Sequence, residues 1–293
     1  MTTRRQILAQ AAMAAPLLLF PTAACNAKAH KPRGAFAEAI AAIEARHGGQ
    51  IGAAVYDYQS KRWHSHRADE RFAMCSTHKY VTVAALLARV DRGQESLDRQ
   101  IAIRQEDIQS YAPAAKERIG GTMSLAELCK ASITVSDNTA ANLLFAAVGG
   151  PAKVTEFIRA QGDRVTSFNR IEPDLNVVEP GDLRDTTTPL AMARLMMKLT
   201  LGKALSESSR GQLNQWLVAN TTGGRRLRGG MPADWIVGDK TGSGGKNTHD
   251  VAVVWPKDRK PMIVTAYYNN GNGETSAARG DVLMEVGRAV ASL

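Results

Sequence analysis

Ser76 and Lys79 form an S-x-x-K motif that could place a nucleophile beside a base. If a helix begins at Ser76, both side chains lie on one face, a single turn apart. A serine hydroxyl is a weak nucleophile until a base takes its proton, and burial lowers the pKa of a lysine enough for that task. The same spacing also fits a chance pair with a solvated lysine, so the motif needs support from elsewhere in the chain.

Ser136-Asp137-Asn138 stands at the start of a later helical stretch. Ser136 could pass a proton to a leaving nitrogen, and Asn138 could bind an amide carbonyl of a substrate. Asp137 is expected to tie the loop together. The alternative is a plain helix N-cap, a position that serine and aspartate favour.

Lys240-Thr241-Gly242 ends a predicted strand and is followed by Ser243. A strand at the edge of a sheet can pair with a substrate backbone, while Lys240 and Thr241 hold a carboxylate. Gly242 would let a ligand approach the strand closely. Alone, the motif could also be a strand that runs into a glycine-rich turn.

In this order the three motifs are the mark of class A β-lactamases and penicillin-binding proteins. The chain resembles the class A serine β-lactamases over roughly residues 35 to 290. The resemblance implies an α+β fold, with one antiparallel sheet formed from both chain ends and an inserted helical domain. It also implies an active site in the cleft between them, a serine acyl-enzyme mechanism on β-lactam antibiotics that confers resistance, and no cofactor.

Glu172 and Asn176 fit the E-x-x-L-N signature of this family, in an omega loop expected over residues 167–185. An acyl-enzyme ester is long-lived unless a positioned base deprotonates a water beside it, which a carboxylate with an amide partner can do. Without the other motifs, a lone glutamate in a polar loop would be interpreted as an exposed surface residue without a catalytic role. With the other motifs present, Glu172 is predicted to be catalytic, beside Ser76, Lys79 and Ser136.

The resemblance assigns roles to further residues. The predicted substrate-binding residues are Tyr111, Asn138, Asn176, Arg226, Lys240, Thr241, Gly242 and Ser243. The backbone N–H groups of Ser76 and Ser243 would form an oxyanion hole. The Ser243 hydroxyl near that hole, together with the room that Gly244-Gly245 would leave beside the strand, resembles members active on cephalosporins, so penicillins and cephalosporins are the expected substrates. Arg170 and Asp185 match the salt bridge at the neck of the omega loop, and Asn142 matches the asparagine that pins this loop. A cis peptide at Glu172-Pro173 is implied by the family and cannot be decided from the sequence.

Two other functions share the first three motifs. A D,D-peptidase or transpeptidase would have no use for Glu172 with Asn176, and a β-lactam sensor would remain acylated. A zinc enzyme would need clustered ligands, but His64, His66 and His249 form no H-x-H-x-D run. No metal site is therefore predicted, and His78 is expected to pack sideways between the nucleophile and the lysine.

Cysteine usage predicts an absence of disulfides in the mature protein. Cys75 precedes the nucleophile, and the family position that would pair with it holds Gly244. Cys129 matches half of another family disulfide, whose partner position holds Val83. Both cysteines are expected to be small buried hydrophobic residues.

Residues 1–29 are predicted to be a signal peptide. Arg4 and Arg5 precede an apolar stretch that ends near Phe20, and an A-x-A-type cleavage site follows at 27–29. The paired arginines indicate the twin-arginine route and a periplasmic destination. A membrane anchor would need about 20 apolar residues, more than this stretch provides. Lipidation at Cys25 is a further alternative.

The composition favours a soluble globular enzyme over a nucleic-acid-binding protein. Without the lysine and two arginines of the signal segment, the formal charge of +9 falls to +6. The basic residues are dispersed among acidic ones and form no stripe interleaved with aromatic residues, so no nucleic-acid partner is expected. We also expect a monomer without stable membrane insertion.

The apolar periodicity predicts strands near both ends of the mature chain and helices between them. The predicted helices are 35–47, 77–91, 125–132, 138–148, 151–161, 188–200, 207–218 and 276–291, and the predicted strands are 51–58, 235–241, 250–255 and 262–268. An α/β domain of residues 30–74 and 219–293 would then enclose a helical domain of residues 75–218.

Overall fold

The computed structural model describes residues 34–179, 181–269 and 275–293. The predicted signal segment 1–29, with its twin-arginine motif and Cys25, lies outside these residues. In the part of the chain that the structure describes, no helix is long and apolar enough to cross a membrane.

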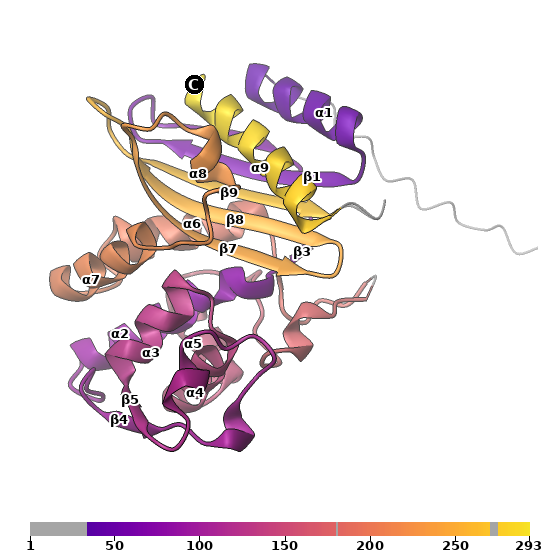
Figure 1. Cartoon of the computed structure of the whole chain (residues 1–293). Helices are drawn as coiled ribbons and strands as arrows, with labels where there is room; N and C mark the ends of the chain where they lie inside the picture. The colour runs from indigo at the N-terminus through magenta and orange to yellow at the C-terminus, as the bar shows by residue number, and fades with distance from the viewer. Residues whose placement is uncertain (1–33, 180, 270–274) are drawn as a thin grey trace, which may run out of the picture. The chain divides into compact units, whose positions relative to one another are not determined.

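A five-stranded antiparallel sheet forms one part of the structure, with the strand order β2-β1-β9-β8-β7 (Figure 1). Its strands are β1 (Gln50–Asp57), β2 (Arg62–His66), β7 (Ile236–Gly244), β8 (Asn247–Trp255) and β9 (Met262–Asn269). The N-terminal strand β1 pairs with β9, so that Ala53 lies opposite Ala266. A sheet built from both chain ends, as predicted, is thereby confirmed.

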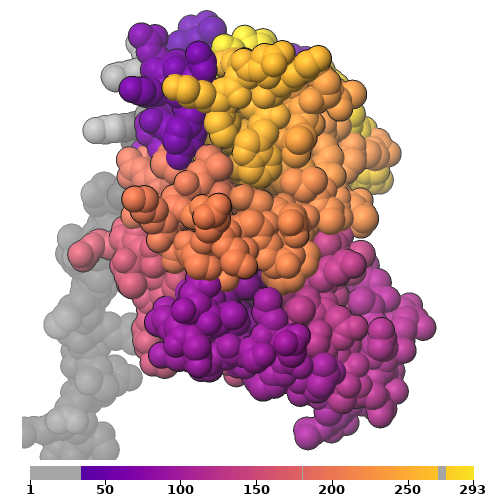
Figure 2. Space-filling model, turned by 90° about the vertical axis from the view of Figure 1, so that its left-hand side faces the viewer, coloured from indigo at the N-terminus to yellow at the C-terminus, as the bar shows by residue number. Residues whose placement is uncertain are grey.

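Three helices cover one face of this sheet. They are α1 (Ala35–His47), α8 (Leu227–Gly230) and α9 (Ser276–Ala291). Ile40 of α1 and Leu283 of α9 are fully buried in a hydrophobic core with Val55 and Val264 of the sheet. Figure 2 shows the indigo atoms of the first described segment beside the yellow atoms of the last. The fold therefore brings the two described ends of the chain together.

A second hydrophobic core lies on the other face of the sheet and continues into the helical segments. These segments are α2 (His78–Asp91), α3 (Leu125–Thr134), α4 (Asn138–Val148), α5 (Pro151–Ala160), α6 (Pro189–Thr200) and α7 (Glu207–Val218). Val251 and Ile263 of the sheet share this core with Leu86 of α2 and Met192 of α6. Because α6 packs against β1, β8 and β9, the sheet and the helical segments share buried surface. The domain boundaries at residues 75 and 219 stay a prediction.

Helix starts follow the capping residues in the sequence. The Ser124 side chain accepts a hydrogen bond from the Glu127 backbone N–H and completes a capping box at the start of α3. Asp137 caps α4 by accepting from the Ala140 N–H at 2.8 Å, and its second oxygen accepts from the backbone of Ala114 and Ala115. Asp137 thus both caps the helix and ties the loop together.

Several short elements were not predicted, because they are too short to show a periodic pattern. They are the strand pairs β3 (Phe72–Ala73) with β6 (Thr186–Thr187) and β4 (Gln100–Ala102) with β5 (Thr122–Ser124). The predicted helix start at Ser76 is instead a 3-10 turn over Cys75–Thr77, after which α2 begins. Cys75 has a φ of 44°, so the backbone turns sharply just before Ser76.

Cys75 and Cys129 are both free thiols in the structure, and both are buried. Burial raises the pKa of each thiol well above its usual range. Two protonated, enclosed thiols are chemically inert, as expected for residues that only pack.

Candidate active site

Ser76 lies in the 3-10 turn where the chain passes under the edge strand β7. Its hydroxyl donates a hydrogen bond to Glu172 Oε1 at 3.3 Å. A Cβ atom on Gly242 of β7 would lie 3.0 Å from the Met74 carbonyl oxygen and 3.1 Å from the Thr77 nitrogen. The glycine of the K-T-G motif therefore lets the strand pack onto the turn that carries the nucleophile, a role that the sequence analysis did not foresee.

Lys79 lies at the start of α2 with its ammonium group fully buried. Nζ donates to the Ser136 carbonyl oxygen at 2.8 Å and to Asn138 Oδ1 at 2.5 Å. It also lies 3.2 Å from Glu172 Oε1. Burial lowers the pKa of Lys79, against the opposing effect of the Glu172 charge. The lysine can therefore lose its proton more readily than a solvated one.

The Ser136 hydroxyl lies between two buried lysines. It accepts hydrogen bonds from Lys79 Nζ at 3.3 Å and from Lys240 Nζ at 3.0 Å. Because ammonium groups only donate, the hydroxyl keeps its own proton for another acceptor. Burial, reinforced by the nearby Lys79 charge, lowers the pKa of Lys240 to about 7. A hydroxyl flanked in this way could pass a proton to a group bound in front of it.

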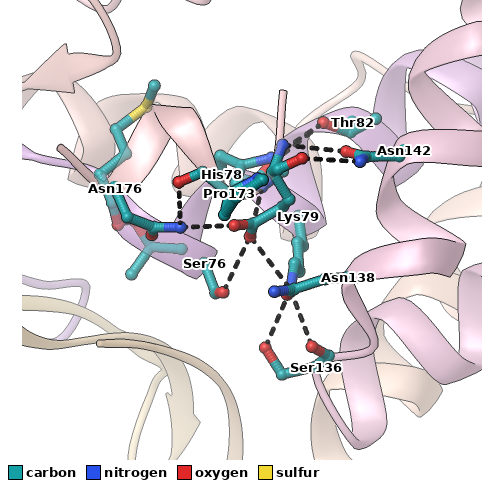
Figure 3. A network of polar contacts seen from close by, with 12 residues as sticks. Ser76, His78, Lys79, Thr82, Ser136, Asn138, Asn142, Pro173 and Asn176 are labelled. Atoms are coloured by element: carbon teal, nitrogen blue, oxygen red, sulfur yellow. Dashed lines mark hydrogen bonds and ion pairs between the residues drawn. The ribbon is translucent and has the colours of Figure 1, made fainter. Parts of the chain in front are cut away.

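The Glu172 carboxylate joins the loop of residues 167–185 to the α2 region, because it contacts Asn176 as well as Ser76 and Lys79. Figure 3 shows these three partners turned toward one another. Oε1 contacts the Ser76 hydroxyl and the Lys79 ammonium, and Oε2 accepts from Asn176 Nδ2 at 2.5 Å. Burial alone would raise the pKa of Glu172, but the His78 hydrogen bond and the Lys79 charge bring it below its usual range. The ionised carboxylate can therefore accept a proton.

Asn142 and an ion pair hold the loop that carries Glu172. Asn142 of α4 bonds the Glu172 backbone twice, accepting from N at 2.9 Å and donating to O at 2.8 Å. Arg170 Nε donates to Asp185 Oδ2 at 2.6 Å, and Asp185 Oδ1 accepts from the Asn169 and Arg170 N–H groups. The Glu172-Pro173 peptide bond is cis.

Replacing Asp185 by alanine is expected to lower the free energy of unfolding by about 3 kcal/mol, because it leaves Arg170 and two N–H groups without their acceptor. Urea unfolding followed by circular dichroism would measure this loss. The control is Glu156→Ala, which breaks only an exposed pair with Lys153 and should leave stability nearly unchanged. Equal stability of both variants would show that the ion pair does not hold the loop.

A cleft of about 410 Å³ opens in front of Ser76. Its lining residues are Ser76, Tyr111, Ser136, Asn138, Glu172, Asn176, Thr222, Arg226, Thr241, Gly242, Ser243 and Ser276. Of the predicted catalytic and binding residues, only Lys79 and Lys240 are absent from this lining. Both are buried and donate hydrogen bonds to the Ser136 hydroxyl. Thr222 and Ser276 were missed. Thr222 shares a 2.6 Å hydrogen bond with Thr241, a contact that no motif signals.

Arg226 supplies a cationic group beside the K-T-G strand. Its Nη2 donates to the Ser243 hydroxyl at 3.2 Å. The side chain is nine-tenths buried, and burial lowers its pKa, partly offset by the Asp250 charge. Because arginine remains protonated in proteins, the cleft holds a permanent positive charge at the end where Thr241 and Ser243 lie.

His78 packs as expected, with its ring stacked on Phe145 at 5.1 Å between centroids. The structure also places His78 Nε2 3.4 Å from Glu172 Oε1, a contact that the sequence analysis missed. No motif signals this contact, because it depends on how the segment that carries Glu172 folds over the start of α2. No group of three or more metal-binding side chains occurs among the described residues.

Comparisons with known proteins show the family to which the chain belongs. Residues 35–292 match the model of the β-lactamase enzyme family. The β-lactamase CTX-M-8 of Citrobacter amalonaticus is 46% identical over 252 residues, 86% of each chain. The β-lactamase OXY-1 of Klebsiella oxytoca is 40% identical over 287 residues, 98% of this chain and 97% of its own.

Among solved structures, an ancestral class A β-lactamase is 53% identical, with a TM-score of 0.86 over 88% of this chain and 99% of its own. The similarity therefore extends over the described sheet and helical segments. The chain belongs to the class A β-lactamases.

Proposed function

We propose that the protein hydrolyses the lactam amide of β-lactam antibiotics through an acyl-enzyme on Ser76. The observation that carries this proposal is the position of Glu172, whose carboxylate contacts the nucleophile and is held by Asn176. A carboxylate in that place can take a proton from a water that attacks the ester. It gives the site a way to release its acyl group, which a penicillin-binding protein or a sensor would not need.

Binding would begin at the positive end of the cleft. Lys240, Thr241 and Arg226 would receive the substrate carboxylate, and the Asn138 amide would meet the side-chain amide of the substrate. Asn138 is oriented for this role by two contacts, from Lys79 Nζ to its Oδ1 and from its backbone N–H to the Tyr111 carbonyl oxygen at 2.9 Å. Tyr111, half exposed at the rim, would pack against the substrate.

Acylation would follow by attack of the Ser76 oxygen on the lactam carbonyl. The backbone N–H groups of Ser76 and Ser243 would stabilise the oxyanion. Lys79, or Glu172 through a water, would remove the hydroxyl proton. Ser136 would deliver its own proton to the departing ring nitrogen and regain one from Lys79 Nζ, which lies 3.3 Å from its oxygen. In deacylation, Glu172 would deprotonate a water that attacks the ester, and Ser76 would recover its proton as the product leaves.

Turnover of a chromogenic cephalosporin by the purified mature protein, followed by absorbance and intact mass, tests this function. We expect rapid colour release without a lasting mass adduct on the wild-type protein. A stable adduct without turnover would instead identify a penicillin-binding or sensor protein. If neither colour release nor an adduct appeared, β-lactams would be excluded as substrates.

The pH dependence of kcat/KM should show the deprotonation of Lys240. Because its pKa is lowered to about 7, Lys240 is charged below neutral pH and loses its charge as the pH rises. Carboxylate capture should then weaken, and kcat/KM, which reports the free enzyme, should fall through a basic limb near pH 7. In Lys240→Arg the side chain remains charged, so this limb should disappear. A limb that is unchanged in the variant would assign it to another group.

Penicillins and cephalosporins are the proposed substrates, although one argument for a broad range needs correction. The glycines after Ser243 were expected to leave room beside the strand. A Cβ atom on Gly244 would lie 3.0 Å from Asn176 Cβ and 3.2 Å from Cys75 Sγ. The loop that carries Asn176 therefore fills the space beside Gly244, whereas a Cβ atom on Gly245 would meet nothing within 4 Å. The proposed cephalosporin activity rests on the Ser243 hydroxyl at the oxyanion hole and on the room beside Gly245.

Export to the periplasm, by the twin-arginine route, is proposed on the sequence of residues 1–29 alone, with lipidation at Cys25 as the alternative. A monomeric state without stable membrane insertion is likewise proposed. Intact mass of the protein recovered from the periplasm would separate cleavage after Ala29 from a lipidated Cys25.

A further inference from the structure

His78 is a fully buried polar side chain for which the mechanism above has no use. It is the first residue of α2 and lies between Ser76 and Lys79 in the chain. The ring stacks on Phe145 with an interplanar angle of 13° and meets the edge of Phe168 at 6.3 Å. An apolar ring would make the same packing contacts, so the two imidazole nitrogens call for a separate explanation.

Both nitrogens face polar partners (Figure 3). Nε2 lies 3.4 Å from Glu172 Oε1, and Nδ1 lies 3.4 Å from the Thr82 hydroxyl oxygen. The same Oε1 atom accepts a hydrogen bond from the Ser76 hydroxyl and lies within ion-pair distance of Lys79. His78 therefore shares the carboxylate oxygen that also contacts the nucleophile.

The chemistry of these partners selects one form of the ring. Burial lowers the pKa of His78, so the imidazole is neutral and carries a single N–H. An ionised carboxylate only accepts hydrogen bonds, whereas the Thr82 hydroxyl can donate as well as accept. The proton therefore belongs on Nε2, facing Glu172, and Nδ1 is left as an acceptor 3.4 Å from the Thr82 hydroxyl, which also lies 3.4 Å from the His78 carbonyl oxygen. The other tautomer would turn a nitrogen lone pair toward the carboxylate.

We propose that His78 is a positioning residue, whose Nε2–H donates to Glu172 Oε1 and keeps this carboxylate ionised and oriented toward Ser76. The role deepens the proposed function and rests on it, because it matters only if Glu172 activates the deacylating water. A donor to the charged form of a carboxyl group favours that form. His78 would thus extend deacylation to lower pH.

Other charges act on the same group and remain in place when His78 is changed. Lys79 of α2 and Lys240 of β7 are the positive groups that face His78, and Asp137 at the start of α4 acts on Lys79. Glu172 is the negative group that faces the ring. The uncharged neighbours of the ring are Phe145, Phe168 and Thr82. Removing the N–H should therefore change the pKa of Glu172 without removing its other partners.

The test compares His78→Phe, which keeps the ring stacking and deletes the N–H, with His78→Gln, which restores a donor. The pH dependence of the deacylation rate would be measured for both and for the wild type. In His78→Phe the acid limb should move up by about one pH unit, which is a tenfold loss on that limb. In His78→Gln it should return toward the wild-type position. A purely structural role would change thermal stability alone.

Nitrogen-15 NMR of the wild-type protein supplies a second measurement, which requires no variant to fold. We expect the His78 ring to show a protonated Nε2 and an unprotonated Nδ1 at neutral pH. A protonated Nδ1, or an acid limb that stays in place in a folded His78→Phe, would overturn the proposal. Failure of the wild type to turn over a β-lactam would instead overturn the proposed function, so the two failures are distinguishable.

Discussion

Replacing Glu172 by glutamine is expected to trap the protein as a covalent acyl adduct. The amide keeps the shape of the side chain but cannot take a proton from water, so general-base assistance to deacylation is lost. Such assistance contributes on the order of 10²- to 10⁴-fold, and we expect deacylation to slow on the order of 10³-fold. Stopped-flow absorbance with a chromogenic cephalosporin and intact mass would show a burst and then a persistent adduct.

Glu179→Gln is the matched control for this experiment, because Glu179 follows Glu172 in the same loop and has an exposed side chain. It should turn over like the wild type. The burst rate of Glu172→Gln adds further information. A burst as fast as the wild type would assign the acylation base to Lys79, and a slowed burst would show that Glu172 also acts in acylation. A variant that still deacylates rapidly would refute the proposed role of Glu172.

The sequence predicts much of this site because each chemical group belongs to a short local motif. Ser76 and Lys79 are one turn apart, and Glu172 and Asn176 are close in the same loop. Such spacings determine geometry through backbone conformation alone. The sheet from both chain ends was predictable for a similar reason, since apolar strands near both termini must find partners.

What was missed depends on contacts between distant segments. Thr222 lines the cleft only because it bonds Thr241 on β7. Gly244 permits the loop that carries Asn176 to pack against the strand, where the sequence suggested free space. The contact of His78 with Glu172 requires the loop to fold back over α2. No single segment contains these distances, and sequence patterns therefore could not predict them.

Lys79 is expected to be the residue whose loss most reduces acylation. Its buried ammonium contacts Ser136, Asn138 and Glu172 beneath the cleft. Lys79→Met removes one of the two candidate bases and also leaves the buried Glu172 charge without its ion-pair partner, which is strongly unfavourable. We expect the burst rate with a chromogenic cephalosporin to fall on the order of 10³-fold or more, from the loss of general-base catalysis and of the charge.

Lys79→Arg separates these two contributions. Arginine keeps a positive charge beside Glu172 but does not give up its proton at any working pH, so it cannot act as a base. If the lysine takes the Ser76 proton, Lys79→Arg should acylate as slowly as Lys79→Met while keeping a thermal stability closer to that of the wild type. The control is Lys153→Arg, at an exposed pair with Glu156, which should not change the burst. Acylation of Lys79→Arg near the wild-type rate would limit Lys79 to an electrostatic role and identify Glu172, hydrogen-bonded to the Ser76 hydroxyl, as the base for both steps.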